Sequence, residues 1–374
     1  MISSIRVEGY RGFERFEMGR LGRINLLVGT NNSGKTSILE ALHLLTSRGD
    51  PAALWQLLWR RGERLPGADS RGPRGGPEPE LDVSHLFTGH ETHPGSRFTL
   101  AAKNQTPERS VTFEIGELSQ KERRELFPAD EGVSARQVLH ITGNPIPPIA
   151  VLPLTRSGGI RLDALDVSQR RIAPARRRFS EIGPSQFITT ESLDSDELVA
   201  FWDKVALTPN ESLVLRALQF LDCEIDRIAA QASSPRYFYG ANRGGFIVKL
   251  KGREQPIPIG SMGDGMWRML AMAIAITQCK GGVLLVDEID TGLHYTVMAD
   301  MWRLIFSAAK ELDVQVFATT HSYDCIQSLA TVCMSETDAS NHVTLQRIEG
   351  GKATSVPYSE HEIKVAAERN VEVR

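Results

Sequence analysis

The sequence predicts an α/β fold built on a mostly parallel central sheet. Three runs are almost wholly apolar, as strands buried on both faces of a parallel sheet are: Ile24–Val28, Val283–Val286 and Val314–Thr319. Stretches with helical apolar periodicity lie between them, within Gly260–Gln278 and Tyr295–Lys310. Because buried strands alternate with helices, we expect helices on both faces of the sheet.

Other segments predict additions to this sheet. Ile2–Gly9 alternates apolar and polar side chains like a half-buried strand. Short strand-like runs follow later and predict an antiparallel β layer: Arg97–Ala102, Ser110–Ile115 and Gln137–Ile141. Asp194–Ala206 and Pro209–Ala230 begin with acidic or proline helix-start signals and predict a helical insertion. Phe246–Leu250 is a further predicted strand.

Composition limits the class of protein. The chain has 374 residues and a net charge of -3, so no overall basicity points to nucleic acid. The four cysteines are widely spaced and indicate neither a disulfide framework nor a zinc site. The N-terminus lacks an apolar signal core, and no apolar stretch is long enough to span a bilayer. We expect a cytoplasmic protein without membrane contact.

A glycine-rich loop directly follows the strand Ile24–Val28. Its residues match the complete P-loop pattern and run on into a helix: Gly29, Thr30, Asn31, Asn32, Ser33, Gly34, Lys35, Thr36 and Ser37. Successive backbone N–H groups of such a loop point into one concavity and, with the helix N-terminus, bind phosphate oxygens. Lys35 would reach the β- and γ-phosphates of ATP, and the Thr36 hydroxyl would bind Mg²⁺. A chance glycine turn is the alternative.

Two acids end the run Val283–Val286. Asp287 would lie at the carboxyl edge of the sheet, where it can hold the Mg²⁺ that Thr36 also binds. Glu288 is then placed to polarise the attacking water as general base. A pair of helix N-cap acids is the alternative interpretation. The presence of a P-loop favours the catalytic one.

A second glycine-rich turn precedes the helix within Gly260–Gln278. It contains Ser261, Gly263 and Gly265, and a helix start of this kind also binds phosphate. Because the P-loop already holds the phosphates, we expect Ser261 and Gly263 of one subunit to cover the γ-phosphate bound by another. This predicts a homodimer closed head to tail. An ordinary glycine-rich helix entry is the alternative.

His321 follows the third apolar run, and a loop follows Glu288. A histidine at this strand end can hydrogen-bond the γ-phosphate and the attacking water, although lone histidines at strand ends are usually structural. Asp290 and Gly292 are placed for a loop along a subunit boundary. We expect Lys35, Glu288 and His321 to be the catalytic residues.

These motifs, in this order, resemble the ABC-type ATPases of the SMC, RecF and OLD group. That group carries a Walker A loop, a signature loop, a Walker B strand with an adjacent glutamate, a D-loop and a switch histidine, and the opening IRVEGYRGF is similar to its usual start. The resemblance implies one ABC-type ATPase domain over 1–374. Residues 51–185 would be a variable insertion with an antiparallel β region, 190–235 a helical insertion, and 245–374 the signature, Walker B and histidine lobe. Gln186 is the candidate Q-loop residue and magnesium ligand.

The resemblance leaves three function classes open. The best match is to stand-alone OLD-like ATPases, which implies a nucleotide-gated sensor or scaffold in phage defence beside a separate, nuclease-like Toprim-type effector. The alternative is a RecF-like DNA repair ATPase. The basic stretch Arg170–Arg178 would supply nucleic-acid contacts there, although a solvated face explains it equally well. A transporter ATPase is disfavoured by the opening strand and the insertion.

Overall fold

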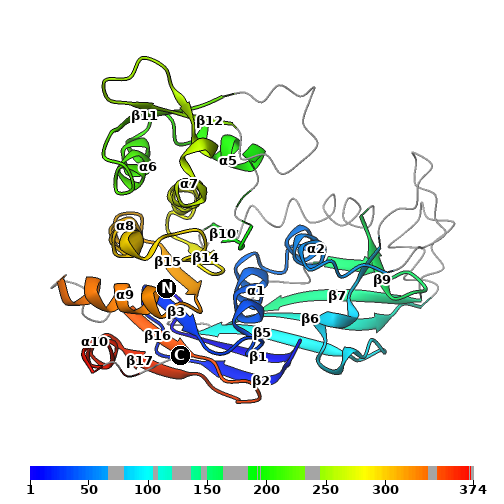
Figure 1. Ribbon diagram of the computed structural model, residues 1–374. Helices are drawn as coiled ribbons and strands as arrows, with labels where there is room; N and C mark the ends of the chain where they lie inside the picture. Colours follow the sequence, from blue (N-terminus) through cyan, green and yellow to red (C-terminus); the bar gives the residue numbers. More distant parts are fainter. Residues whose placement is uncertain are drawn as a thin grey trace.

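A computed structural model gives the fold. It describes residues 1–65, 80–103, 108–119, 136–144, 150–162, 184–191, 193, 195–231, 245–335, 343–369 and 371. The α/β prediction is confirmed, with two large sheets, two small ones and helices between and around them (Figure 1).

The central sheet contains the three apolar runs. Its strand order is β10-β14-β15-β3-β16-β17, and only the β16–β17 pairing is antiparallel. The strands are β3 (Ile24–Val28), β10 (Ser185–Ile188), β14 (Val283–Val286), β15 (Gln315–Thr319), β16 (Val343–Arg347) and β17 (Val356–Ser359). Every residue of β3, β14 and β15 is buried, which explains their apolar composition.

A second, antiparallel sheet has the order β2-β1-β5-β6-β7-β8. Its strands are β1 (Ser4–Tyr10), β2 (Phe13–Met18), β5 (Arg97–Lys103), β6 (Arg109–Glu117), β7 (Gln137–Asn144) and β8 (Ala150–Pro153). The predicted strand Ile2–Gly9 thus pairs directly with the predicted antiparallel run Arg97–Ala102. The antiparallel layer is therefore completed by the N-terminal hairpin, and residues 51–185 do not form it alone.

Helix α1 (Lys35–Thr46) lies between the two sheets. Its apolar side chains share one core with the antiparallel sheet and with Leu27, Leu285 and Phe317 of the central sheet. Leu26 and Val286 alternate with these residues and enter the second core, on the opposite face. The helix that follows the glycine loop is consequently fixed from both sides.

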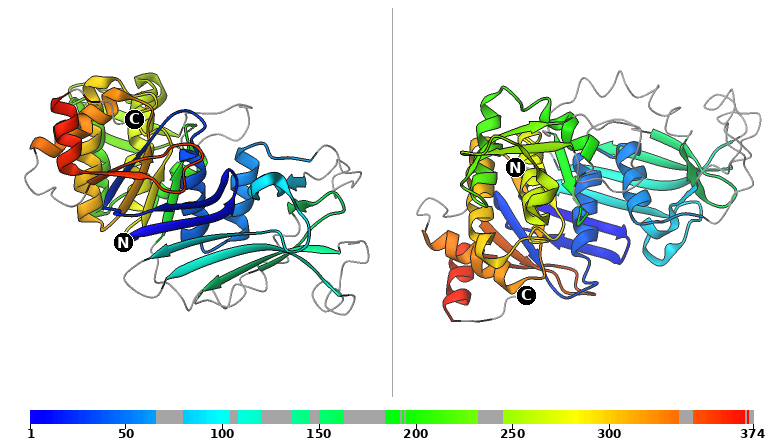
Figure 2. Two further views of the ribbon diagram at one scale, coloured as in Figure 1. Left: turned by 90° about the horizontal axis from the view of Figure 1, so that it is seen from below. Right: turned by 45° about the horizontal axis from the view of Figure 1, so that its top comes forward.

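Helices cover the opposite face of the central sheet (Figure 2). They are α5 (Ser195–Trp202), α6 (Pro209–Gln219), α7 (Asp264–Thr277), α8 (Met298–Glu311), α9 (Tyr323–Ser335) and α10 (Glu360–Glu368). A small sheet lies beside α6 and α7 and contains β11 (Ile225–Ala230), β12 (Phe246–Leu250) and β13 (Ile257–Pro258). The remaining elements are α2 (Pro51–Arg60), β4 (Glu80–Asp82), β9 (Gly159–Arg161) and the 3-10 turns Ser84–Leu86, Thr88–His90, Ile259–Met262 and Tyr295–Val297.

The predicted helix Pro209–Ala230 is wrong in its second half. The helix ends at Gln219, and Ile225–Ala230 is a strand that pairs with β12. Ile225 and Ile228 are buried, but their spacing of three residues also fits a helix. A register shift between Ile225 and Arg227 breaks the alternation that would have indicated a strand.

A buried ionic cluster fastens the N-terminal hairpin to α1 and α2. Arg11 lies in the turn between β1 and β2, and its Nε is 2.9 Å from Glu40 Oε2. The second Glu40 oxygen is 2.6 Å from Arg61 Nε, and Arg11 also pairs with Glu63 at 2.6 Å. Through Glu40 the cluster links the hairpin turn to α1, and through Arg61 and Glu63 it links both to the segment that follows α2.

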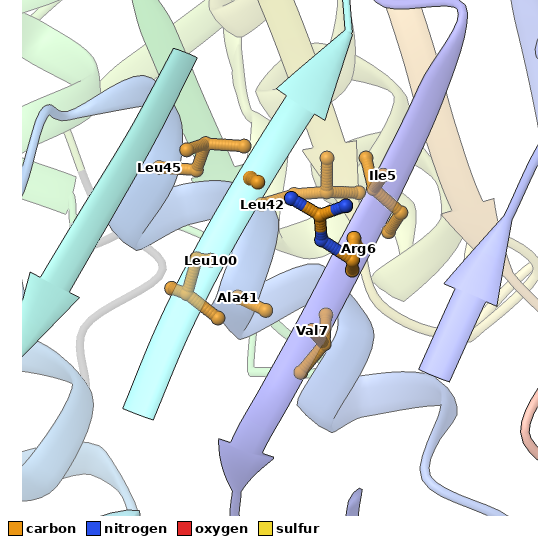
Figure 3. A pocket seen from close by; sticks show the side chains of 8 residues that line it. Ile5, Arg6, Val7, Ala41, Leu42, Leu45 and Leu100 are labelled. Carbon is orange, nitrogen blue, oxygen red and sulfur yellow. The ribbon is translucent and has the colours of Figure 1, made fainter. Parts of the chain in front are cut away.

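A small pocket lies between β1, β5 and the C-terminal half of α1 (Figure 3). It is lined by Ile5, Arg6, Val7, Ala41, Leu42, Leu45, Leu100 and Ala101. The pocket is therefore distant from the start of α1. It is not the candidate site described below.

None of the four cysteines forms a disulfide, and three of them are buried. Among the described residues, no helix combines the length and apolar character needed to cross a bilayer.

Candidate active site

The loop between β3 and α1 has a backbone shape that requires glycine at both ends. Gly29 has a φ of 144°, and a Cβ there would lie 2.2 Å from the carbonyl oxygen of Ile348. Gly34 has a φ of 99°, and a Cβ there would lie 2.3 Å from the ring of Phe13 in the N-terminal hairpin. Side chains are therefore excluded sterically at both positions. The hairpin thus packs directly against this loop.

The N-terminal end of α1 is left free for an anion. Gly34 is its N-cap and supplies no side-chain hydrogen bond, and the first turn contains no acid. The Ser33 hydroxyl is buried without a hydrogen-bond partner in the described part of the chain. Thr30, Asn31 and Asn32 form an exposed rim, Asn32 with a φ of 61°. Unsatisfied donors at a helix start bind phosphate, so this loop fits the predicted phosphate-binding role.

Lys35 folds back over the loop. Its Nζ donates to the carbonyl oxygens of Gly29 at 2.9 Å and Thr30 at 2.8 Å. Burial lowers the pKa of Lys35, while the charges of Asp287 and Glu288 act in the opposite direction. The charge of Lys35 therefore interacts with those of the predicted magnesium ligand Asp287 and the predicted general base Glu288. Ser37, the last residue of the predicted set, lies on the first turn of α1, where Arg61 Nη2 donates to its hydroxyl at 3.5 Å.

Thr36 and Asp287 meet, although 251 positions separate them. The Thr36 hydroxyl donates to Asp287 Oδ1 at 3.1 Å and Oδ2 at 3.2 Å. Parallel strands place the carboxyl ends of β3 and β14 at one edge of the sheet, and this edge brings the two residues together. Thr319, at the end of β15 between them, donates to Asp287 Oδ1 at 2.6 Å.

Glu288 occupies a strained turn beside Asp287. Its φ is 45°, a left-handed value uncommon for residues other than glycine. The backbone N–H donates to Thr319 Oγ1 at 2.8 Å, and the Thr291 hydroxyl donates to Glu288 Oε2 at 3.2 Å. Such strain persists only where surrounding contacts hold it, and it concentrates at functional sites.

Arg268, which no sequence motif indicated, supports this turn from α7. Its side chain extends from α7 and is only 3% exposed. The guanidinium donates to the carbonyl oxygens of Thr189, Asp287 at 2.7 Å and Glu288 at 3.0 Å. Burial lowers the pKa of Arg268 to about 10, although the nearby acids oppose the shift. A single arginine in a predicted helix gives no sequence signal of this role.

The structure does not support the prediction that Gln186 is a magnesium ligand. Gln186 lies within β10 and pairs with Leu284, three residues before Asp287 along the neighbouring strand. Phe187 belongs to the core that contains α1, so alternation turns Gln186 to the other face. The structure does not bring it to Thr36 and Asp287. The residues that reach this edge after β10 are Thr189, Thr190 and Glu191.

The signature-like turn lies on the other face of the central sheet. Ser261 and Gly263 are exposed, and Gly265 packs closely on the loop after Glu288, because a Cβ there would lie 3.0 Å from the Gly292 carbonyl oxygen. His321 follows β15 at the same edge as Asp287. The basic stretch Arg170–Arg178 lies outside the described residues.

The side-chain oxygen atoms at this edge of the sheet are of the kind that bind magnesium. Mg²⁺ is usually held by one or two carboxylates, hydroxyl groups and substrate phosphates. Asp287 and Thr36 supply a carboxylate and a hydroxyl within hydrogen-bond distance of each other. No group of three His, Cys, Asp or Glu side chains that could hold a metal occurs in the described ranges. Any Mg²⁺ here would therefore be shared with a phosphate ligand.

Comparison with known proteins decides the family. Residues 24–324 match the family described as "AAA domain, putative AbiEii toxin, Type IV TA system". The chain belongs to this family. With its P-loop and the Asp287–Glu288 pair, it is a P-loop ATPase.

Curated relatives of the ATPase are distant. An "ATP/GTP phosphatase" of Helicobacter pylori is 21% identical over 349 residues, which cover 89% of this chain and 88% of that protein. An uncharacterized protein of Methanocaldococcus jannaschii is 39% identical over 66 residues, or 16% of this chain and 30% of that protein.

Solved SMC head domains are similar to the ATPase over almost their whole length. The head domain from Thermotoga maritima is 12% identical with a TM-score of 0.44, covering 96% of this chain and 98% of that one. The head domain with an extended coiled coil, bound to the C-terminal domain of ScpA derived from Pyrococcus furiosus, is 13% identical with a TM-score of 0.45, covering 99% of each chain.

Proposed function

We propose that the chain binds ATP–Mg²⁺ on its P-loop and hydrolyses the bond between the β- and γ-phosphates, giving ADP and phosphate, with Glu288 as general base. The observation that carries this proposal is the contact between Thr36 and Asp287, because it joins the phosphate loop to the strand that ends in Glu288. Nucleotide and water-activating carboxylate then share one edge of the sheet.

The residues have separate roles in this proposal. When ATP binds, the Lys35 ammonium leaves the carbonyl oxygens of Gly29 and Thr30 and donates instead to oxygens of the β- and γ-phosphates. Thr36 and Asp287 would hold Mg²⁺, which neutralises phosphate charge when bound. Glu288 accepts a proton from the attacking water, and His321 donates a hydrogen bond to the γ-phosphate.

The proposed assembly is a homodimer closed head to tail. The P-loop starts α1 on one face of the central sheet, whereas the turn with Ser261 and Gly263 starts α7 on the other. Both the P-loop rim and this turn are exposed. Two-fold pairing can therefore place the Ser261 turn of each subunit over the P-loop of its partner.

The biological role that we propose is a nucleotide-gated sensor or scaffold in phage defence, acting beside a separate nuclease-like effector. The family description names a putative toxin of a toxin–antitoxin system, and such a system has two components. The separate nuclease-like effector is what the OLD-like resemblance implies. The alternative from the same resemblance, a RecF-like DNA repair ATPase, has no support in the family description.

Substituting Lys35 and Glu288 separates binding from hydrolysis. Lys35→Ala should weaken ATP binding by at least tenfold, because the P-loop loses its only proposed cation for the β- and γ-phosphates. Glu288→Gln should bind ATP with near-normal affinity and lower kcat roughly a hundredfold or more. Calorimetry and phosphate release measure the two effects. Normal turnover by Glu288→Gln would show that Glu288 is not the base.

The dimer is tested with Ser261→Arg. In a Glu288→Gln background, ATP should double the mass measured by light scattering, and Ser261→Arg should abolish this change without weakening ATP binding. Lys35→Ala should lose both binding and dimer. A mixture of the Ser261→Arg and Lys35→Ala chains should recover some dimer, since a mixed pair keeps one complete composite site. An ATP-induced dimer that tolerates Ser261→Arg would contradict the head-to-tail arrangement.

The defence role predicts a cellular phenotype. Cells that carry the native gene neighbourhood should lose resistance to a restricted phage when the chain carries Lys35→Ala, measured as the efficiency of plaque formation. Unchanged plaque numbers would reject this role and leave the ATPase assignment intact. Stimulation of ATP turnover by duplex or gapped DNA alone would favour the repair class instead.

A further inference from the structure

Two consecutive threonines precede His321: Thr319 is the last residue of β15, and Thr320 follows it. Thr319 is 1% exposed and Thr320 is 0% exposed. Their hydroxyl groups bind different acids, both of which belong to the loop that follows β14. Neither hydroxyl is needed for the β-sheet pairing of its strand, so these contacts require another explanation.

Thr319 makes two contacts with the catalytic turn. Its hydroxyl donates to Asp287 Oδ1 at 2.6 Å and accepts the Glu288 backbone N–H at 2.8 Å. The left-handed turn at Glu288 leaves this partly buried N–H outside the regular sheet ladder, and the Thr319 hydroxyl is its acceptor. One hydroxyl thus fixes both a carboxylate orientation and a backbone conformation.

Thr320 makes an equivalent contact with Asp290, a later acid of the same loop. Its hydroxyl donates to Asp290 Oδ1 at 2.6 Å and accepts the backbone N–H of Ser322 at 2.9 Å. Thr320 has the same side chain as its neighbour and is also buried, but its hydroxyl contacts Asp290 where that of Thr319 contacts Asp287. It therefore offers a matched control on the same strand end.

We propose that Thr319 is a positioning residue that orients Asp287 for the metal–nucleotide complex and holds the Glu288 turn in register with His321. This inference rests on the proposed function. Thr36 also donates to Asp287, but its hydroxyl oxygen is itself a proposed magnesium ligand and cannot keep that role unchanged when Mg²⁺ binds. Thr319 is the donor that remains.

The physical basis is the orientation of the carboxylate plane. A carboxylate side chain has a broad, weakly restricted terminal torsion. The 2.6 Å bond from Thr319 to Oδ1 fixes that torsion, with both carboxylate oxygens of Asp287 within 3.2 Å of the Thr36 hydroxyl. Hydrogen-bond partners of metal-binding carboxylates contribute roughly 10- to 100-fold to metal affinity.

The test measures nucleotide binding rather than turnover. In the full-length chain with Glu288→Gln, the affinity for a fluorescent ATP analogue is measured by anisotropy in EDTA and across a Mg²⁺ titration. Thr319→Val should leave the affinity in EDTA unchanged and raise the Mg²⁺ concentration for half-maximal tightening roughly tenfold. Thr319→Ser, which keeps the hydroxyl, should restore the parent value. Thr320→Val should not change the Mg²⁺ requirement.

The outcomes separate this inference from the proposed function. A parent chain that binds no nucleotide would reject the proposed function itself. A parent that binds, with Thr319→Val showing the parent Mg²⁺ requirement, would overturn only the inference. An equal shift in Thr320→Val would also overturn it, because the effect would then belong to the strand end as a whole. If Thr319→Val lacks the parent circular dichroism spectrum, Thr319→Ala is read in the same way.

Discussion

The contact between the Thr36 hydroxyl and the Asp287 carboxylate is the interaction on which the site depends. It joins the start of α1 to the end of β14, two elements far apart in the chain. The contact exists because β3, β15 and β14 are adjacent and parallel, so that their carboxyl ends form one edge. Burial of these strands on both faces fixes that order, and the packing of α1 between two sheets fixes the position of Thr36.

Around this contact, buried polar groups hold the acids from three sides. Thr319 reaches Asp287 from β15, Thr320 reaches Asp290, and Arg268 reaches the carbonyl oxygens of the turn from α7. Since α7 begins at the exposed turn with Ser261, the arginine connects the proposed subunit boundary to the catalytic turn within one chain. A movement of α7 would therefore shift Arg268 and change the position of the Glu288 backbone that it binds.

Much of this arrangement could be predicted from the sequence, because it follows from patterns among neighbouring residues. The apolar runs that include β3, β14 and β15 indicated buried strands, and the glycines of the P-loop indicated a backbone that excludes side chains, as Gly29 and Gly34 show. The family match of residues 24–324 agrees with these motifs. Asp287 was placed correctly beside Thr36, since strand ends in parallel sheets share an edge.

The rest depended on tertiary contacts that leave no local pattern. Arg268 and Thr319 are ordinary residues in a helix and a strand, and only folding brings them to the Walker B turn. Gln186 was misplaced because a glutamine near a strand has no preferred end of that strand. The pairing of the N-terminal hairpin with β5 is a long-range register, which the alternation within β1 cannot specify.

A double-mutant cycle of Thr36 and Asp287 tests the central contact most directly. Calorimetry would give the affinity for ATP with Mg²⁺ of the parent, Thr36→Val, Asp287→Asn and the double variant. If the two residues hold the same metal–nucleotide complex, the double variant should lose little more affinity than the more damaging single variant. Losses that multiply, as those of independent sites do, would contradict a shared site at this edge of the sheet.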